Sequence, residues 1–168
     1  MTSRHRRVRI REATPADLPW MAPLFEALMN RSRAWFGLPT FSREKSRRAA
    51  RNYIGGQLRR FRGPRGFALV AELGARPVGF VTVELHRSPA DDQVRAYTSG
   101  EVQELHVQRG FRRQGVGTAL MAAVERRVRS CRGTLVSLYT HPRLRAAHRF
   151  YGQQGYQVVS VKFDKRLP

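Results

Sequence analysis

The sequence predicts an α/β (α+β) domain in which a central sheet carries helices on its faces. Short segments alternate apolar and polar residues, as half-buried strands do, and longer runs between them place apolar residues at helical spacing. The chain has 168 residues, of which 41% are hydrophobic. That length and composition suit one domain with its own core. We therefore expect residues 1–168 to form a single domain, with a flexible basic segment at 1–6.

The first part of the chain predicts one strand and two helices. Val8–Arg11 alternates apolar and polar residues and is expected to be a strand. Thr14-Pro15 is typical of a helix start and precedes apolar residues at helical spacing, which predicts a helix over roughly 15–30. A second helix is expected to begin at Ser42, and Gly55-Gly56 is expected to weaken it.

The middle of the chain predicts a hairpin and a further strand at 101–107. The apolar positions of that strand change parity between Val102 and Leu105, and a one-residue bulge would explain the change. The hairpin comprises strands at 67–73 and 78–85 joined by a tight turn at 74–77, followed by a polar loop at about 87–99. The remaining elements are a helix from Gly115, a strand at 134–139, a short helix at 143–151 and a final strand at 157–163.

Composition limits the class of protein. The 32 Lys and Arg against 12 Asp and Glu give a formal net charge of +20, and 29 of the 32 are Arg. This charge leaves a nucleic-acid binder and an enzyme for anionic ligands both open. Apolar runs fall short of the ~20 residues of a membrane span, and the Arg-rich start predicts no secretory signal. The single Cys131 suits a reducing compartment, so we expect a cytoplasmic protein that does not bind membranes.

A glycine-rich turn between the strand at 101–107 and the helix from Gly115 is the most specific segment. The first N–H groups of a helix lack intrahelical partners and lie at the positive end of its dipole. Gly115 and Gly117 would let an anion approach these groups, and Arg112 and Arg113 add positive charge. The segment is neither a Walker P-loop nor a dinucleotide-binding fingerprint.

These residues resemble the GNAT superfamily of acetyl-CoA-dependent N-acetyltransferases. Arg112-Arg113-Gln114-Gly115-Val116-Gly117, behind Leu105–Val107, is similar to the family's Arg/Gln-x-x-Gly-x-Gly/Ala signature. Ala147–Tyr156 is similar to its Ala-x-x-x-Tyr-x-x-x-Gly-Phe segment, and Ile10–Asp17 and Val78–Phe80 resemble its opening and third strand. The matches follow the family's order and span nearly the whole chain.

The resemblance implies a fold and a cofactor site. The fold would be a mixed, mostly antiparallel sheet, splayed near the fourth strand and flanked by about four helices. Acetyl-CoA would be the co-substrate, its pantetheine arm pairing with the strand backbone and the Val107 N–H polarising the thioester carbonyl. Leu144 stands where many members carry Asn, which puts a side-chain hydrogen bond to the cofactor in doubt. The implied cofactor-binding residues are Leu105, His106, Val107, Arg112, Arg113, Gln114, Gly115, Val116, Gly117 and Thr118.

The resemblance also implies an acid and a base. The acceptor amine must lose a proton before it attacks, and a positioned carboxylate can take it. Glu104, immediately before Leu105–Val107, is the first candidate, with Glu101 and His106 as alternatives. Tyr151 matches the family tyrosine that gives a proton to the departing CoA thiolate. The five histidines lack metal-ligand spacing, so no metal is expected.

The segment 84–104 is acidic within a basic protein. It holds five acidic residues against two arginines, a net charge of −3, which suggests either a mouth for a cationic amine or a solubilising loop. Most aromatic residues of the first two helices are expected in the core, although Trp35-Phe36 could line the acceptor pocket. The acidic residues are Glu84, Asp91, Asp92, Glu101 and Glu104.

The resulting hypothesis is an enzyme, an acyltransferase that moves acetyl from acetyl-CoA to a primary amine in a ternary complex. The acceptor would be a cationic small molecule or a peptide amine, and the protein a monomer or a homodimer. The alternatives are a GNAT-like domain that binds CoA without catalysis and a basic nucleic-acid-binding protein.

Overall fold

A computed structural model describes residues 7–35, 39, 41–89 and 96–161. The chain forms two compact units, Met1–Leu138 and Tyr139–Pro168. Within the described residues, every helix is too short or too polar to cross a membrane.

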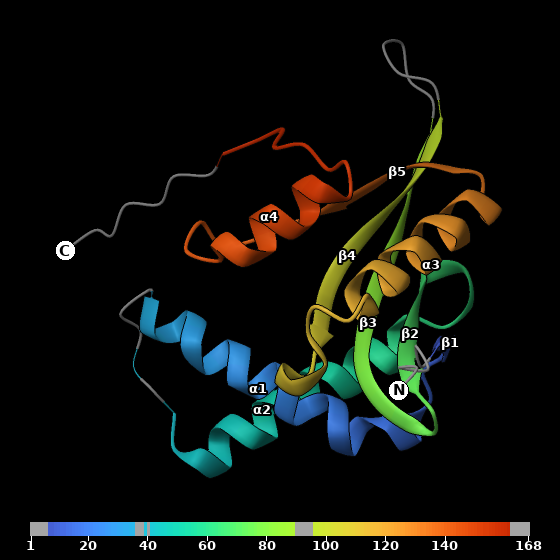
Figure 1. Cartoon of the computed structure of the whole chain (residues 1–168). Helices are drawn as coiled ribbons and strands as arrows, with labels where there is room; N and C mark the ends of the chain where they lie inside the picture. Colours follow the sequence, from blue (N-terminus) through green and yellow to red (C-terminus); the bar gives the residue numbers. More distant parts are fainter. Residues whose placement is uncertain (1–6, 36–38, 40, 90–95, 162–168) are drawn as a thin grey trace, which may run out of the picture. The chain divides into compact units, whose positions relative to one another are not determined.

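The first unit is built on a five-stranded sheet whose strands lie in the order β1-β2-β3-β4-β5 (Figure 1). Neighbouring strands are antiparallel, except that β4 and β5 are parallel. The mixed, mostly antiparallel sheet that we predicted is therefore confirmed. The strands are β1 (Val8–Glu12), β2 (Gly66–Leu73), β3 (Arg76–Ser88), β4 (Tyr97–Val107) and β5 (Gly133–Leu138).

Helices cover both faces of this sheet. Phe80 of β3 packs with Met21 and Ile54, residues of the first two helices. The adjacent Gly79 points the opposite way, toward Val116 of the third helix, since successive strand residues face opposite sides. The first two helices therefore share one face and the third covers the other (Figure 1). The helices of this unit are α1 (Leu18–Trp35), α2 (Arg43–Arg60) and α3 (Val116–Ser130), and α4 (Arg145–Gln153) belongs to the second unit.

The predicted helix starts are confirmed, whereas the first helix ends later than expected. Thr14 precedes a short 3₁₀ turn, Pro15–Asp17, which leads into α1. Ser42 caps α2, and its hydroxyl accepts the N–H of Lys45. Helix α2 continues through Gly55, which is buried. A Cβ added at this position would lie 3.4 Å from Leu18 of α1, an ordinary van der Waals contact.

The bulge predicted in β4 is present. Val83 of β3 lies opposite Val102 and Thr82 opposite Glu104, so Gln103 is the extra residue. A bulge adds one residue to a strand, so beyond it the alternation of side chains between the two sheet faces is shifted. As a result Glu104 lies on the same face as Thr82, which is the α1 and α2 face. Pairing of β4 with β5 ends at Val102, and this is the predicted splay.

Two expectations about strand extent were wrong. Strands β3 and β4 remain paired out to Ser88 and Tyr97, well inside the polar loop expected at 87–99, because backbone pairing does not require apolar side chains. The final strand expected at 157–163 is not formed over residues 157–161. Its valines are exposed, and none of the described residues supplies a partner strand, without which a valine-rich segment does not join a sheet.

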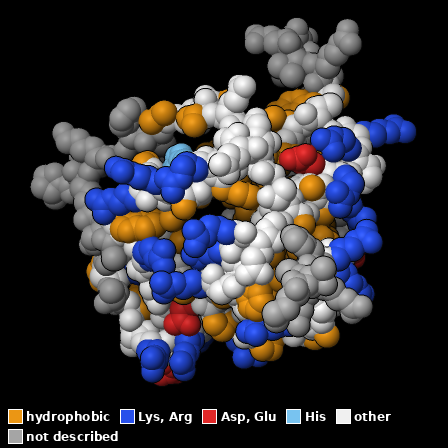
Figure 2. All heavy atoms as spheres, in the orientation of Figure 1, with side chains coloured by type: hydrophobic (Ala, Val, Ile, Leu, Met, Phe, Trp, Pro, Cys, Tyr) orange, Lys and Arg blue, Asp and Glu red, His pale blue; other side chains and the backbone are white. Residues whose placement is uncertain are grey.

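The surface is strongly basic. On the face that Figure 2 shows, Lys and Arg side chains lie among apolar ones, and acidic side chains are few. Many of the arginines lie on α2, where Arg47, Arg48 and Arg51 are exposed.

Candidate active site

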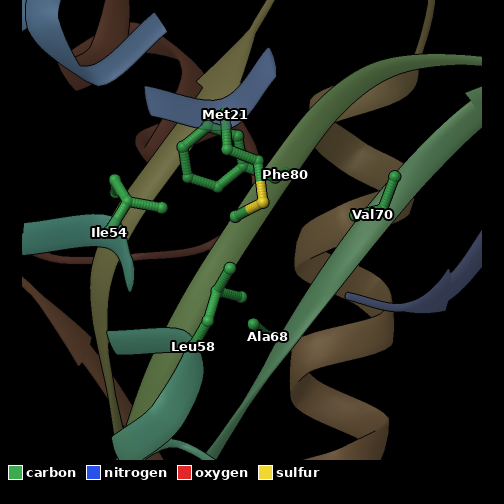
Figure 3. Packing of buried hydrophobic residues seen from close by; sticks show 6 residues of the cluster. All are labelled: Met21, Ile54, Leu58, Ala68, Val70 and Phe80. Carbon is green, nitrogen blue, oxygen red and sulfur yellow. The ribbon is translucent and has the colours of Figure 1, made fainter. Parts of the chain in front are cut away.

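A polar cluster lies on the sheet face that α1 and α2 cover. Phe80, on the same face, belongs to the buried apolar core of the first unit (Figure 3). Phe80, Thr82 and Glu84 of β3 lie on this face, and the register places His106, Glu104 and Glu101 of β4 opposite them. The core side chains labelled in Figure 3 are Met21, Ile54, Leu58, Ala68, Val70 and Phe80.

Glu104 and His106 form a close, buried pair at the centre of the cluster. His106 Nε2 lies 2.9 Å from Glu104 Oε2, and the two side chains are 9% and 10% exposed, respectively. A carboxylate can only accept a hydrogen bond, so Nε2 carries the hydrogen. The structure therefore brings together two of the three base candidates.

Tyr53 of α2 completes this cluster. Burial, the negative charge of Glu104, a hydrogen bond to the Glu104 carboxylate and the charge of Glu84 raise the pKa of the phenol to about 12. Tyr53 therefore stays protonated at neutral pH and donates to Glu104. Sequence patterns did not predict this contact, because Tyr53 lies far from β4 in the chain and only helix packing brings them together.

Aromatic rings pack against two of the three residues, His106 and Tyr53. The His106 ring stacks on Phe80, with centroids 4.9 Å apart and an interplanar angle of 18°, and Phe25 meets it edge-on at 6.3 Å. Phe25 also stacks on Tyr53 at 4.5 Å. Such contacts restrict ring rotation and favour one orientation.

The other acidic side chains of the segment 84–104 have different partners. Glu84 forms an ion pair with Arg60 of α2. Glu101 lies 3.4 Å from His86 Nε2 and accepts the Gln103 amide at 2.9 Å. Asp91 and Asp92 lie outside the described residues, as does Phe36 of the proposed pocket lining.

The glycine-rich turn has the backbone shape of an anion site. Arg113 and Gly115 both adopt left-handed conformations, with φ of 61° and 76°, and α3 begins at Val116. The first N–H of the helix that has a partner within it is that of Ala119, which donates to the Gly115 carbonyl at 2.9 Å. The N–H groups of 115–118 precede it and are the orphan donors of this helix start. An added Cβ at Gly115 would meet nothing within 4 Å, so the approach is open.

The strand that leads into this turn presents backbone groups at its open edge. The Gln108 N–H donates to the Val78 carbonyl at 2.9 Å, and hydrogen-bonding groups alternate along an antiparallel pair. The N–H and C=O of Leu105 and Val107 therefore point away from β3. Since β5 pairs with β4 only as far as Val102, this edge has no strand partner among the described residues. Arg112 Nε donates to the Val107 carbonyl at 3.1 Å.

Tyr151 belongs to the second unit. It lies in α4, half-buried, with ring contacts to Phe150 at 5.1 Å and Tyr156 at 5.9 Å. His148 of the same helix is exposed and its Nε2 lies 3.2 Å from the His141 carbonyl. No group of three or more metal-ligating side chains is found within the described ranges.

Comparisons with known proteins agree with this architecture. A model of the acetyltransferase (GNAT) family matches residues 25–156. Aminoalkylphosphonate N-acetyltransferase from Salmonella typhimurium is 40% identical over 68 residues, which cover 40% of this chain and 44% of that protein. The match thus spans less than half of either sequence.

Solved structures share the fold at low identity. A mutant of the BH1408 protein from Bacillus halodurans has a TM-score of 0.78 at 17% identity, over 95% of this chain and 99% of that one. An aminoglycoside acetyltransferase from an uncultured soil metagenomic sample, in complex with sisomicin, has a TM-score of 0.66 at 20% identity, over 96% and 97%. These identities establish likeness of fold alone. Because the family model spans most of the sequence, the chain belongs to the acetyltransferase (GNAT) family.

Proposed function

We propose that this protein transfers an acetyl group from acetyl-CoA to a primary amine by direct attack in a ternary complex. One observation carries the proposal: β4 contributes both to the cofactor side of such a site and to the base that would act on the amine. Its open edge leads into the glycine-rich turn, and the buried Glu104 carboxylate lies on the same short stretch of strand. Family membership supports the reaction class.

The turn and the strand edge fit acetyl-CoA, which supplies the acetyl group as a thioester. The orphan N–H groups from Gly115 to Thr118 and the exposed Arg112 and Arg113 would bind the pyrophosphate, with Gln114 and Val116 in the same turn. The outward backbone groups of Leu105 and Val107 would pair with the pantetheine arm. The Val107 N–H would polarise the thioester carbonyl and stabilise the negative charge that develops on its oxygen.

Glu104 is the group that we propose takes the proton of the amine, directly or through water. An alkyl ammonium has a pKa near about 10.4, so the amine is mostly protonated at neutral pH. Glu104 directly precedes Leu105–Val107, and its side chain is 10% exposed, whereas that of Glu101 is 27% exposed. His106 Nε2 already donates to Glu104, so this nitrogen does not accept a proton. These observations favour Glu104 among the three candidates.

Tyr151 is proposed to give a proton to the departing thiolate. The support is its place in the motif Ala147–Tyr156 and the family to which the chain belongs. Leu144, which caps α4, has no polar side chain to offer the cofactor.

The acceptor is proposed to be a cationic small molecule or a peptide amine. Three carboxylates, of Glu84, Glu101 and Glu104, lie on one sheet face of a protein that carries a net charge of +20. An ammonium group would be attracted to that face. The related proteins named above act on aminoalkylphosphonates and aminoglycosides, and both classes contain amines.

The test is turnover with purified protein, acetyl-CoA and an amine panel, followed by thiol release. The panel contains aminoalkylphosphonates, aminoglycosides, polyamines and peptides with free amines. We expect turnover with at least one class. Glu104→Gln should lower kcat about 100-fold or more, whereas Glu125→Gln, which alters a surface carboxylate paired with Arg129, should not.

The alternatives give different results in the same experiment. Acetyl-CoA binding without turnover on any amine would favour a CoA-binding domain without catalysis. Steeply salt-dependent binding to arbitrary DNA without acetyl transfer would favour a nucleic-acid-binding protein. Tyr151→Phe should abolish thiol release with cofactor binding intact, and Tyr156→Phe serves as its control. Unchanged turnover in Tyr151→Phe would reject the assigned acid.

A further inference from the structure

We propose that Tyr53 and His106 are positioning residues that together hold the Glu104 carboxylate in the orientation in which it accepts the proton of the amine. The inference rests on the proposed function and extends the active site onto α2. No motif of the sequence marks Tyr53 for such a role.

The burial of Glu104 requires these donors. Its side chain is 10% exposed, and removing an ionised carboxylate from water is costly unless hydrogen bonds replace the lost solvation. His106 supplies one at 2.9 Å, and the Tyr53 hydroxyl supplies another. The two donors approach from different elements, β4 and α2, and so restrict rotation of the carboxylate.

The donors are themselves fixed. The stack on Phe80 and the edge contact with Phe25 hold the His106 ring, and the same Phe25 stacks on Tyr53. Phe25 therefore links both donors through apolar contacts alone. A base held within a narrow range of orientations reduces the reorganisation needed at the moment of proton transfer.

The two donors differ in exposure. Tyr53 is 41% exposed, whereas the side chain of His106 is 9% exposed. Solvent therefore reaches part of Tyr53, while His106 is enclosed by the protein.

Several charged groups lie near the cluster of Tyr53, Glu104 and His106 and affect its pH dependence. Glu84 of β3 acts on Tyr53 and is itself paired with Arg60 of α2. Glu101 and His86 lie on the same face, toward the β3–β4 loop. These four groups are left intact in the variants below.

The experiment compares Tyr53→Phe and His106→Gln with the wild-type protein. Phenylalanine keeps the stack on Phe25 and removes only the hydroxyl, and glutamine keeps an amide donor but does not titrate. For Tyr53→Phe we expect kcat to fall about tenfold, the effect of one hydrogen bond to a charged group. The KM for acetyl-CoA and the Tm should stay close to wild type. Tyr97→Phe, at an exposed tyrosine of β4, is the control.

The pH profile separates positioning from a merely structural role. Each donor stabilises the ionised carboxylate, so its removal should move the acid limb of the kcat profile to higher pH. The shift should be smaller in His106→Gln, which retains a donor, than in His106→Leu. Unchanged acid limbs in Tyr53→Phe and His106→Leu, with Glu104→Gln inactive, would overturn the inference, as would rate losses that merely track a fall in Tm.

A measurement that needs no turnover distinguishes failure of the proposed function from failure of the positioning role. Nitrogen-15 NMR of the histidine rings should show His106 with its hydrogen on Nε2, and Glu104→Gln and Tyr53→Phe should each perturb that signal more than the signal of the exposed His148. If no amine in the panel is acetylated, the proposed function fails. An Nε2 without hydrogen, or a signal that does not respond to Glu104→Gln, overturns the positioning contact instead.

Discussion

At the scale of single residues, Asp17 shows how a buried charge is satisfied. Its carboxylate accepts hydrogen bonds from Arg11 at 2.7 and 2.8 Å, from the Thr14 N–H at 2.7 Å and from Trp20 at 3.1 Å. Burial alone would raise its pKa, but these hydrogen bonds outweigh burial and hold the pKa well below the ordinary value. The residue thereby joins β1 to the start of α1.

Asp17→Asn should destabilise the fold in a pH-dependent manner. Because the pKa of Asp17 is lower in the folded than in the unfolded state, its contribution is complete above about pH 4 and is lost as the pH falls further. We expect a loss of about 2–3 kcal/mol in the free energy of unfolding at pH 7, shrinking below pH ~4. Urea denaturation across pH measures it. Glu44→Gln, at an exposed position on α2, should show no such loss.

Gly115 is constrained by conformation rather than by packing. Gly115→Ala should reduce stability by about 1 kcal/mol, since φ is +76° and L-residues avoid that region. It should also weaken acetyl-CoA binding, because the new methyl group enters the open approach to the orphan N–H groups. Gly110→Ala is the matched control: its Cβ also meets nothing within 4 Å, and its φ is outside the left-handed region. Equal effects in a denaturation and binding assay would contradict the conformational explanation.

At the scale of elements, the contact between α3 and the sheet is tight around Val128. An added Cβ at Gly100 would lie 2.5 Å from Val128 Cγ2, and one at Gly133 would lie 2.3 Å from Val128 Cγ1 and 2.9 Å from the Val128 carbonyl. The two glycines therefore let β4 and β5 approach the helix. They differ in whether a side chain or the backbone stands in the way.

This difference predicts that Val128→Ala offsets the loss of stability in Gly100→Ala but not in Gly133→Ala. Gly100→Ala should cost about 1–3 kcal/mol through overpacking, and adding Val128→Ala should cost less than the sum of the single changes, because the obstructing methyl group is removed. Gly133→Ala should not be rescued by Val128→Ala, since the carbonyl remains. A double-mutant cycle by chemical denaturation measures both couplings, and rescue of Gly133→Ala would argue against this packing.

At the scale of the whole molecule, positive charge predominates, while Glu84, Glu101 and Glu104 lie together on one sheet face. The net charge of +20 produces a general attraction for anions, which salt screens. Local contacts at Arg112 and Arg113, both exposed, would add to that attraction for CoA. The two effects are separable because only the second depends on position.

Acetyl-CoA binding should weaken as salt rises, and Arg112→Gln with Arg113→Gln should flatten that dependence. Arg47→Gln with Arg51→Gln removes the same charge from the exposed face of α2 and should leave the slope nearly unchanged, since neither side chain belongs to the turn and salt screens charges that do not contact the ligand. Calorimetric titration at several salt concentrations measures the slopes. Equal slopes for the two pairs would mean that net charge alone attracts the ligand.

Local patterns in the sequence were sufficient to predict the five strands that form the sheet, the helices, the helix starts at Thr14 and Ser42, the bulge in β4 and the glycine-rich turn. These features depend on neighbours in the chain: side-chain period, capping chemistry and backbone conformation. The mixed topology of the sheet came from the family resemblance instead. Glu104 could be proposed because it directly precedes Leu105–Val107, which match the family pattern and lead into that turn.

Tertiary structure decided what the sequence could not. Tyr53, Phe25 and Glu104 meet only because α1 and α2 pack against β4, and no local period records which helix face lies over which strand residue. Residues 157–161 are rich in valine, as strands often are, yet form none, since pairing requires a partner strand that the segment itself does not contain. Local energetics determined the elements, whereas contacts between distant segments determined which side chains surround the proposed base.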